Sequence, residues 1–288
     1  MKGLVLSITA GQGHNQTAMV ISKRFNECGV ECKYLDVYKF INPILSDSVN
    51  KIYLMSTKAI PKIYGGVYRM CEKRGVQSGA GIHGLNRITN SVLSRSLIKL
   101  IQKEKPDFII CTHIFAALLV TYISSIERLN AKTIGVITDF TIHPYWEDSL
   151  LDYYIIANER LTIQGIKKGF PENKFLPLGI PIGTKFSRKI EKSKAKEILN
   201  LHSKHTILVM SGSMGFGAVY KEIEELDKLD MDFEIVSVSG NNKKLKTKID
   251  SMETRKKIYS YGYIKKLRII LYLLPVFCII SGIHNKIF

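Results

Sequence analysis

Four polar segments carry the residue types that could perform chemistry, and each follows an apolar run that predicts a buried strand. They are Gly11-Gln12-Gly13-His14-Asn15, Thr112-His113, Thr138-Asp139 through Trp146, and Asn158-Glu159. Ligands of open α/β sheets bind outside the carboxyl ends of the strands. We therefore expect one cleft to be lined by His14, His113, Asp139, His143 and Glu159. Polar loops without a ligand are the alternative interpretation.

The first of these segments is a glycine loop that opens a predicted helix. Its glycines permit a tight turn and the close approach of a ligand, and the unpaired N–H groups of the helix can bind an anion or a polarised hydroxyl. A dinucleotide site would use Asp36 at the end of the second predicted strand, but Gln16-Thr17 replaces the third glycine of that motif. No Walker lysine follows the loop, which argues against nucleoside triphosphate hydrolysis.

The segment from Thr138 to Trp146 offers a second set of acid–base residues. Asp139 and His143 could take a proton from a hydroxyl, and Trp146 is the only tryptophan of the chain. The alternative is that Asp139 caps a turn and His143 stabilises a loop. No third ligand follows at a convincing spacing, so we expect no metal.

A second glycine-rich loop runs from Ser211 to Gly217, between a predicted strand and a predicted helix. Backbone N–H groups of such a loop can bind phosphate oxygens. Because this loop opens the second half of the chain as the first glycine loop opens the first half, we expect it to hold a diphosphate in a cleft between two domains.

Short apolar runs alternate with helical patterns along the chain, which predicts a doubly wound α/β fold. The expected strands cover Leu4 to Ile8, Val30 to Val37, Phe108 to Cys111, Thr133 to Ile137, Tyr153 to Ala157, Thr206 to Met210, Phe233 to Val238 and Cys278 to Ser281. The expected helices cover Asn15 to Cys28, Ser91 to Lys103, Ala116 to Ile126 and Ala218 to Leu226. The turn-rich segment Pro177 to Gly183 and a charged stretch after it separate two domains, residues 1–184 and 185–288.

The net charge of +17 favours anionic partners such as phospholipid head groups or nucleotide phosphates. The segment Asp47 to Arg69 mixes basic, aromatic and apolar residues, which suits a membrane surface or an ordinary core-facing helix. No nucleic-acid-binding module is recognisable, so we expect no nucleic acid partner. Five cysteines without paired spacing indicate neither a disulfide scaffold nor a zinc site, and a reducing cytosol is the expected compartment.

Taken in order, these motifs resemble the monogalactosyldiacylglycerol synthase and processive diacylglycerol glucosyltransferase family over residues 3 to about 266. The motifs that carry the resemblance are Ser7 through Asn15, Thr112-His113, Thr138-Asp139-Phe140 with His143-Pro144 and Trp146, Asn158-Glu159, Gly179-Ile180-Pro181, and Ser211 to Gly217. The resemblance implies a GT-B fold, in which two Rossmann-like doubly wound domains face a cleft, here with the second domain incomplete.

The resemblance also implies an activity: transfer of a hexose from a UDP-sugar to diacylglycerol in glycolipid synthesis, without a cofactor, at the cytoplasmic face of an anionic membrane. It implies catalytic roles for His14, Asp139 and His143. Acceptor binding would fall to Gly11, Gly13, Asn15, His113, Trp146 and Glu159. Donor binding would fall to Gly212, Ser213, Gly215 and Gly217.

One departure from the family pattern concerns the nucleotide-binding end of the second domain. After Ile264 the family continues to a Lys-Pro-Gly-Gly segment and an acidic residue, whereas this chain reads Cys278 to Ser281 as a strand and ends at Phe288. Truncation with loss of activity is therefore one expectation. A catalytically inactive lipid- or acceptor-binding remnant and a murein-pathway UDP-amino-sugar transferase are the alternatives. The apolar run Ile269 to Ile283 predicts a helix and a strand, or an apolar tail on the membrane.

Overall fold

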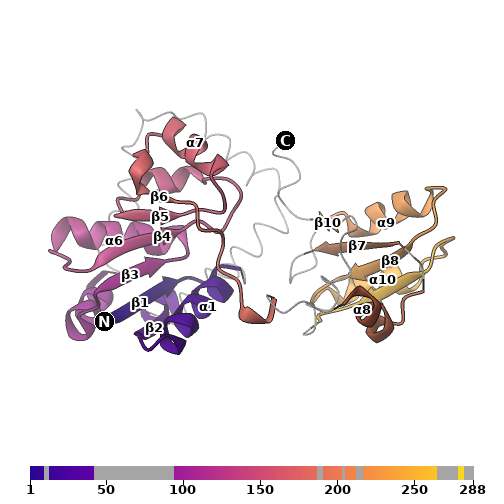
Figure 1. Cartoon of the computed structure of the whole chain (residues 1–288), viewed down its shortest axis with the longest axis horizontal. Helices are drawn as coiled ribbons and strands as arrows, with labels where there is room; N and C mark the ends of the chain where they lie inside the picture. The colour runs from indigo at the N-terminus through magenta and orange to yellow at the C-terminus, as the bar shows by residue number, and fades with distance from the viewer. Residues whose placement is uncertain are drawn as a thin grey trace. The chain divides into compact units, whose positions relative to one another are not determined.

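The computed structural model describes residues 1–9, 13–41, 94–186, 191–202, 205–211, 217–264 and 278–281 of the 288-residue chain. The chain divides into two compact units, Met1–Gly183 and Thr184–Phe288, a division that falls beside the expected boundary. Each unit contains a parallel sheet with helices packed on it (Figure 1). The predicted membrane segment from Asp47 to Arg69 lies outside the described residues.

The first unit is built on a six-stranded sheet in the order β2-β1-β3-β4-β5-β6. Its strands are β1 (Lys2–Ser7), β2 (Glu31–Asp36), β3 (Phe108–Cys111), β4 (Lys132–Val136), β5 (Tyr153–Ile155) and β6 (Phe175–Leu176). Every neighbouring pair is parallel. All carboxyl ends therefore meet at one edge of the sheet, and the neighbours of β1 lie on both of its sides.

Helices cover both faces of this sheet. They are α1 (Gly13–Glu27), α2 (Val37–Ile41), the helical residues 94–104, α6 (Ile114–Ile126), η1 (Pro144–Asp148), α7 (Arg160–Lys167) and η2 (Glu172–Lys174), whereas η3 (Thr184–Phe186) begins the second unit. Side chains alternate along β1, so Val5 packs with α1 residues on one face while Leu4 and Leu6 pack with Leu97 and α6 on the other. A strand buried on both faces explains the continuous apolar run after Gly3.

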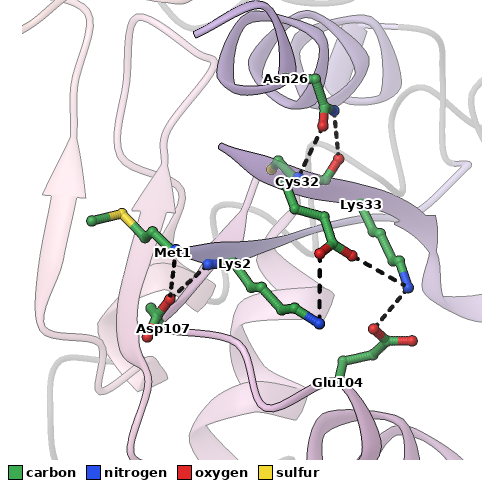
Figure 2. A network of polar contacts seen from close by, with 8 residues as sticks. Met1, Lys2, Asn26, Cys32, Lys33, Glu104 and Asp107 are labelled. Atoms are coloured by element: carbon green, nitrogen blue, oxygen red, sulfur yellow. Dashed lines mark hydrogen bonds and ion pairs between the residues drawn. The ribbon is translucent and has the colours of Figure 1, made fainter. Parts of the chain in front are cut away.

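Polar contacts join β1 and β2 to neighbouring segments of the first unit (Figure 2). Lys33 Nζ lies 2.7 Å from Glu104 Oε2, and the backbone N–H of Lys2 donates to Asp107 Oδ2 at 2.6 Å. An ion pair with an exposed partner, such as Lys33 with Glu104, contributes little stability. Asn26 holds the turn after α1, because its amide group donates to Cys32 O at 2.7 Å and accepts from Cys32 N at 3.1 Å.

The second unit contains a four-stranded parallel sheet in the order β10-β7-β8-β9. Its elements are α8 (Lys192–Leu199), β7 (Thr206–Ser211), α9 (Val219–Asp227), β8 (Glu234–Val238), α10 (Lys243–Asp250), β9 (Ile258–Tyr261) and β10 (Cys278–Ser281). Residues of β7 and β8 contribute to two separate apolar clusters, one on each face. The strand expected at Cys278 to Ser281 is β10, and it pairs with β7.

Trp146 lies in the core of the first unit. It is 3% exposed, and its ring meets Tyr154 edge-on with ring centroids 6.2 Å apart. Gly135 of β4 leaves the space for this packing: a Cβ added there would lie 2.9 Å from Trp146 Cζ3 and 3.0 Å from Tyr154 Cδ1. We therefore assign Trp146 to the core rather than to direct contact with an acceptor.

This packing makes Gly135→Ala destabilising. We expect the free energy of unfolding of the first unit to fall by about 1–3 kcal/mol, because the new methyl group must displace two aromatic rings. Urea unfolding followed by the fluorescence of Trp146 measures this change. Gly13→Ala is the control, because a Cβ there meets nothing within 4 Å. Equal stabilities of the two variants would contradict the assignment of Trp146 to a tightly packed core.

Candidate functional site

His14 lies in the first turn of α1 and is held at two points by Thr112, the residue that follows β3. The Thr112 hydroxyl donates to the backbone carbonyl of His14 at 3.1 Å, and the Thr112 carbonyl lies 2.9 Å from His14 Nδ1. Thr112 is itself fully buried, and its N–H donates to Leu6 O of β1. The sheet therefore fixes both the backbone and the ring of His14.

The partners of the His14 ring determine its tautomer. A carbonyl oxygen can only accept a hydrogen bond, so His14 Nδ1 must carry the hydrogen and donate it to Thr112 O. The hydroxyl oxygen of Thr138, 2.9 Å from the same nitrogen, is then a second acceptor of this N–H, so the hydrogen bond is bifurcated. The lone pair of the neutral ring is left on Nε2. His14 thus presents a basic nitrogen on the side of the ring away from its anchors.

His113 is oriented the opposite way. Its Nδ1 accepts from the N–H of Phe115 at 3.2 Å and so caps the N-terminus of α6. The ring is 6% exposed and lies edge-on to His14, with ring centroids 4.7 Å apart. Burial, and after it the positive charges that His14 and His143 can carry, lower the pKa of His113 to about 3. His113 is therefore uncharged near neutral pH and packs against the His14 ring.

His143 also uses Nδ1 as an acceptor, here for the N–H of Tyr145 at the start of η1. A neutral imidazole whose Nδ1 accepts carries its hydrogen on Nε2, so His143 has no basic nitrogen in this state. Asp139 is half-buried next to Thr138, and no hydrogen bond or ion pair of its side chain is found among the described residues. His14 and Asp139 are therefore both candidate bases, and of these two only His14 has side-chain hydrogen bonds to described residues.

A chain of hydrogen bonds joins the ends of β1 and β2 to α1. Thr9 Oγ1 donates to Asp36 Oδ2, and Asn15 Nδ2 donates to Thr9 Oγ1 at 2.8 Å. Asp36 Oδ1 accepts from the N–H of Lys39 at 3.2 Å, so both carboxylate oxygens are engaged within the protein. This use of Asp36 argues against a ribose contact in a dinucleotide site. The buried Oδ1 of Asn15 has no partner among the described residues.

The predicted site residues other than Trp146 therefore fall into four groups. His14, Asn15, His113, Asp139 and His143 lie on segments that meet at the carboxyl edge of β1, β3 and β4, and Gly13 begins α1 beside them. Glu159 is exposed at the start of α7, without a side-chain capping bond. Gly11, Gly212, Ser213 and Gly215 lie outside the described residues. Gly217 is described, with a φ of 116°, immediately before α9.

Two residues that position His14, Thr112 and Thr138, were not among the predicted site residues. Both follow a buried strand and directly precede a predicted site residue, His113 or Asp139. A threonine at the end of a strand is common, so the sequence could indicate its place at the edge of the sheet. It could not show that two such threonines meet at one histidine.

Within the described ranges, no cluster of three His, Cys, Asp or Glu side chains could bind a metal ion. The described helices also include none with both the length and the apolar character needed to cross a bilayer.

Comparison with known proteins gives a family match over the first unit. The family model for monogalactosyldiacylglycerol (MGDG) synthase matches residues 14–182. A processive diacylglycerol beta-glucosyltransferase of Bacillus pumilus is 27% identical over 278 residues, with 92% of this chain and 68% of the relative covered. The uncharacterized glycosyltransferase YkoN of Bacillus subtilis is 24% identical over 220 residues, with 76% of this chain and 56% of the relative covered. The chain thus spans little more than half of the length of YkoN.

Solved structures show the fold of the whole chain. Anabaena HepE in complex with UDP-glucose has a TM-score of 0.54 at 11% identity, with 95% of this chain and 72% of that chain covered. MurG of Acinetobacter baumannii has a TM-score of 0.51 at 12% identity, with 92% of this chain and 67% of that chain covered. The chain therefore has the GT-B fold.

The buried neutral His113 makes the stability of the first unit depend on pH. The unfolded chain binds a proton at His113 below a pH of about 6.5, whereas the folded chain does so only near its lowered pKa of about 3. Stability is therefore full above about pH 6.5 and falls as the pH decreases toward about 3. Between about pH 7.5 and about pH 5, this group should remove about 2 kcal/mol from the free energy of unfolding.

His113→Asn tests this, because asparagine can still cap α6 but does not titrate in this range. Urea unfolding followed by Trp146 fluorescence at the two pH values should show a smaller acid-dependent loss in the variant, by about 2 kcal/mol. An unchanged pH dependence in His113→Asn would show that the His113 ring is not held in its neutral form by the fold.

Proposed function

Because the chain belongs to the monogalactosyldiacylglycerol synthase family, we propose that it transfers a hexose from a UDP-sugar to diacylglycerol, with His14 as the base. The observation that carries this proposal is the tautomer of His14, set by the 2.9 Å contact of Nδ1 with Thr112 O, which leaves Nε2 able to take a proton. A hydroxyl acceptor needs such a base, because it becomes a competent nucleophile as its proton is removed.

The proposed reaction is a single displacement. The acceptor oxygen forms a bond to the anomeric carbon of the sugar while its proton moves to His14 Nε2. The bond between that carbon and the β-phosphate oxygen breaks, and its electron pair leaves with UDP. The imidazolium then returns the proton to solvent.

The donor side is proposed for the loop between β7 and α9. This loop leaves the carboxyl end of a central strand, and Gly217 adopts a φ of 116° that other residues rarely adopt. The N-terminus of α9 follows at Val219, and helix N-termini stabilise phosphate charge. Gly212, Ser213 and Gly215 belong to the same proposal. The solved complex of HepE with UDP-glucose supports a UDP-sugar as donor for this fold.

The acceptor side is proposed for the carboxyl edge of β1, β3 and β4. The Bacillus pumilus relative, a processive diacylglycerol beta-glucosyltransferase, supports diacylglycerol as acceptor. An insoluble acceptor requires the protein to work at a lipid surface, and the net charge of +17 favours an anionic one. We therefore propose peripheral association with the cytoplasmic face of the membrane.

Substitution of the base tests the mechanism. We expect His14→Ala to lower kcat for hexose transfer by about 10²- to 10⁴-fold, because general-base catalysis is lost. Asp139→Asn is the matched variant at the other candidate base, and we expect it to keep kcat within about tenfold of the parent. The measurement is transfer of labelled glucose or galactose from the UDP-sugar to diacylglycerol in anionic vesicles. A larger loss in Asp139→Asn than in His14→Ala would reverse the assignment.

The same assay separates the rival functions. The chain covers 68% of the Bacillus pumilus relative. The assay is therefore run on the 288-residue chain and on a fusion of that chain to the remaining part of the relative. Absence of transfer by both proteins, with flotation on vesicles retained, would support a lipid-binding protein instead. Transfer of N-acetylglucosamine to a lipid-linked amino sugar, without transfer to diacylglycerol, would support the murein-pathway alternative.

We also propose that transfer requires no metal ion, since backbone N–H groups and a helix N-terminus would stabilise the leaving diphosphate. We expect the transfer rate in EDTA to lie within about twofold of the rate in buffer with Mg²⁺. Loss of one hydrogen bond to the leaving diphosphate would lower the rate by more than this. Loss of transfer in EDTA that Mg²⁺ restores would contradict this expectation.

A further inference from the structure

Thr138 contacts the candidate base from a different strand than Thr112 does. Its Oγ1 lies 2.9 Å from His14 Nδ1, on the nitrogen opposite to the one that would take the acceptor proton. Since that Nδ1 carries a hydrogen, both Thr138 Oγ1 and Thr112 O act as its acceptors. Two oxygens from the ends of β3 and β4 thus share one N–H of His14.

The position of Thr138 is fixed on both sides along the chain. On one side, Ile137 is fully buried, and its N–H donates to Ile155 O of β5 at 2.9 Å. On the other side, Gln164 of α7 accepts from the N–H of Ile142 at 2.9 Å and donates to Thr141 Oγ1 at 2.9 Å. The segment that bears Thr138 is therefore held in place by hydrogen bonds to β5 and α7.

We propose that Thr138 is a positioning residue for proton transfer: as a second acceptor beside Thr112 O, it binds the Nδ1–H of His14 and stabilises the imidazolium that forms when Nε2 takes the acceptor proton. In many enzymes a carboxylate accepts from this ring nitrogen. Here a hydroxyl and a carbonyl do so, and neither adds a negative charge. This assignment rests on the proposed transfer reaction.

Charge development during the reaction explains why Thr138 would affect the rate. In the ground state, His14 is neutral and its Nδ1–H is a moderate donor. As the proton arrives at Nε2, the ring becomes a cation, and hydrogen bonds from a charged donor are roughly twice as strong as neutral ones. The contact to Thr138 therefore strengthens toward the transition state, which affects kcat rather than KM.

The test compares Thr138→Val, which keeps the shape and removes the hydroxyl, with Thr138→Ser, which keeps the hydroxyl. We expect Thr138→Val to lower kcat by about 10- to 100-fold with KM within about twofold, and Thr138→Ser to recover most of the loss. Thr162→Val is the control, because Thr162 lies on α7 and its hydroxyl has no hydrogen bond within the described part of the chain. Trp146 fluorescence verifies that each variant is folded.

A second readout does not depend on activity. Long-range ¹H–¹⁵N NMR spectra of the histidine rings, with the His14 signals identified by their loss in His14→Ala, report which nitrogen carries the hydrogen. We expect Nδ1–H at His14 in the parent and in both variants, because Thr112 O still accepts from it. We expect the Nδ1 chemical shift of His14 to change in Thr138→Val, which loses one acceptor, and to stay near the parent value in Thr138→Ser.

The two readouts keep this proposal separate from the proposed function. If the parent protein transfers no sugar, the proposed function fails, and the Nδ1 chemical shift of His14 in Thr138→Val still decides whether the Thr138 hydroxyl binds the ring. A chemical shift that is unchanged in Thr138→Val overturns the proposal. It is also overturned if Thr138→Val keeps kcat within about twofold, or if Thr138→Ser is no more active than Thr138→Val.

Discussion

Strand β1 is the element on which the candidate site depends. It pairs in parallel with β2 on one side and with β3 on the other, so its carboxyl end lies between two diverging connections. Helix α1 begins in this gap, and its first turn carries His14 to the end of β3, where Thr112 binds it at two points. Parallel pairing of buried strands is what brings residues some hundred positions apart along the sequence to one edge.

The second unit repeats this arrangement with other residues. Strand β7 lies between β10 and β8, and the chain leaves its carboxyl end through a glycine-containing loop into α9, as it leaves β1 into α1. In both units a glycine loop thus follows a strand that has parallel neighbours on both sides. The reason is geometric: at such a strand the following helix begins in open space, so its unpaired N–H groups can meet a ligand.

His14, His113 and His143 show that one residue type can serve opposite purposes at neighbouring positions. In His113 and His143, Nδ1 accepts from a backbone N–H at the start of a helical segment, so the ring completes the local structure. In His14, Nδ1 donates to a backbone carbonyl, so the second nitrogen keeps its lone pair. The difference lies in whether the nearest main-chain group is a donor or an acceptor, and this depends on which end of an element faces the ring.

The sequence alone determined the elements with strong periodic patterns. The apolar run Phe108 to Cys111 became β3, and the glycine loops and their order indicated the family and the GT-B fold. Short elements with weak patterns, such as the two-residue β6 and the eight-residue α7, were not predicted. Only the tertiary structure decided which polar residues work together. It placed Trp146 in the core, engaged Asp36 within the protein, and brought Thr112 and Thr138 to His14. Hydrogen-bond direction depends on the relative orientation of groups from different strands, and a linear pattern does not contain that orientation.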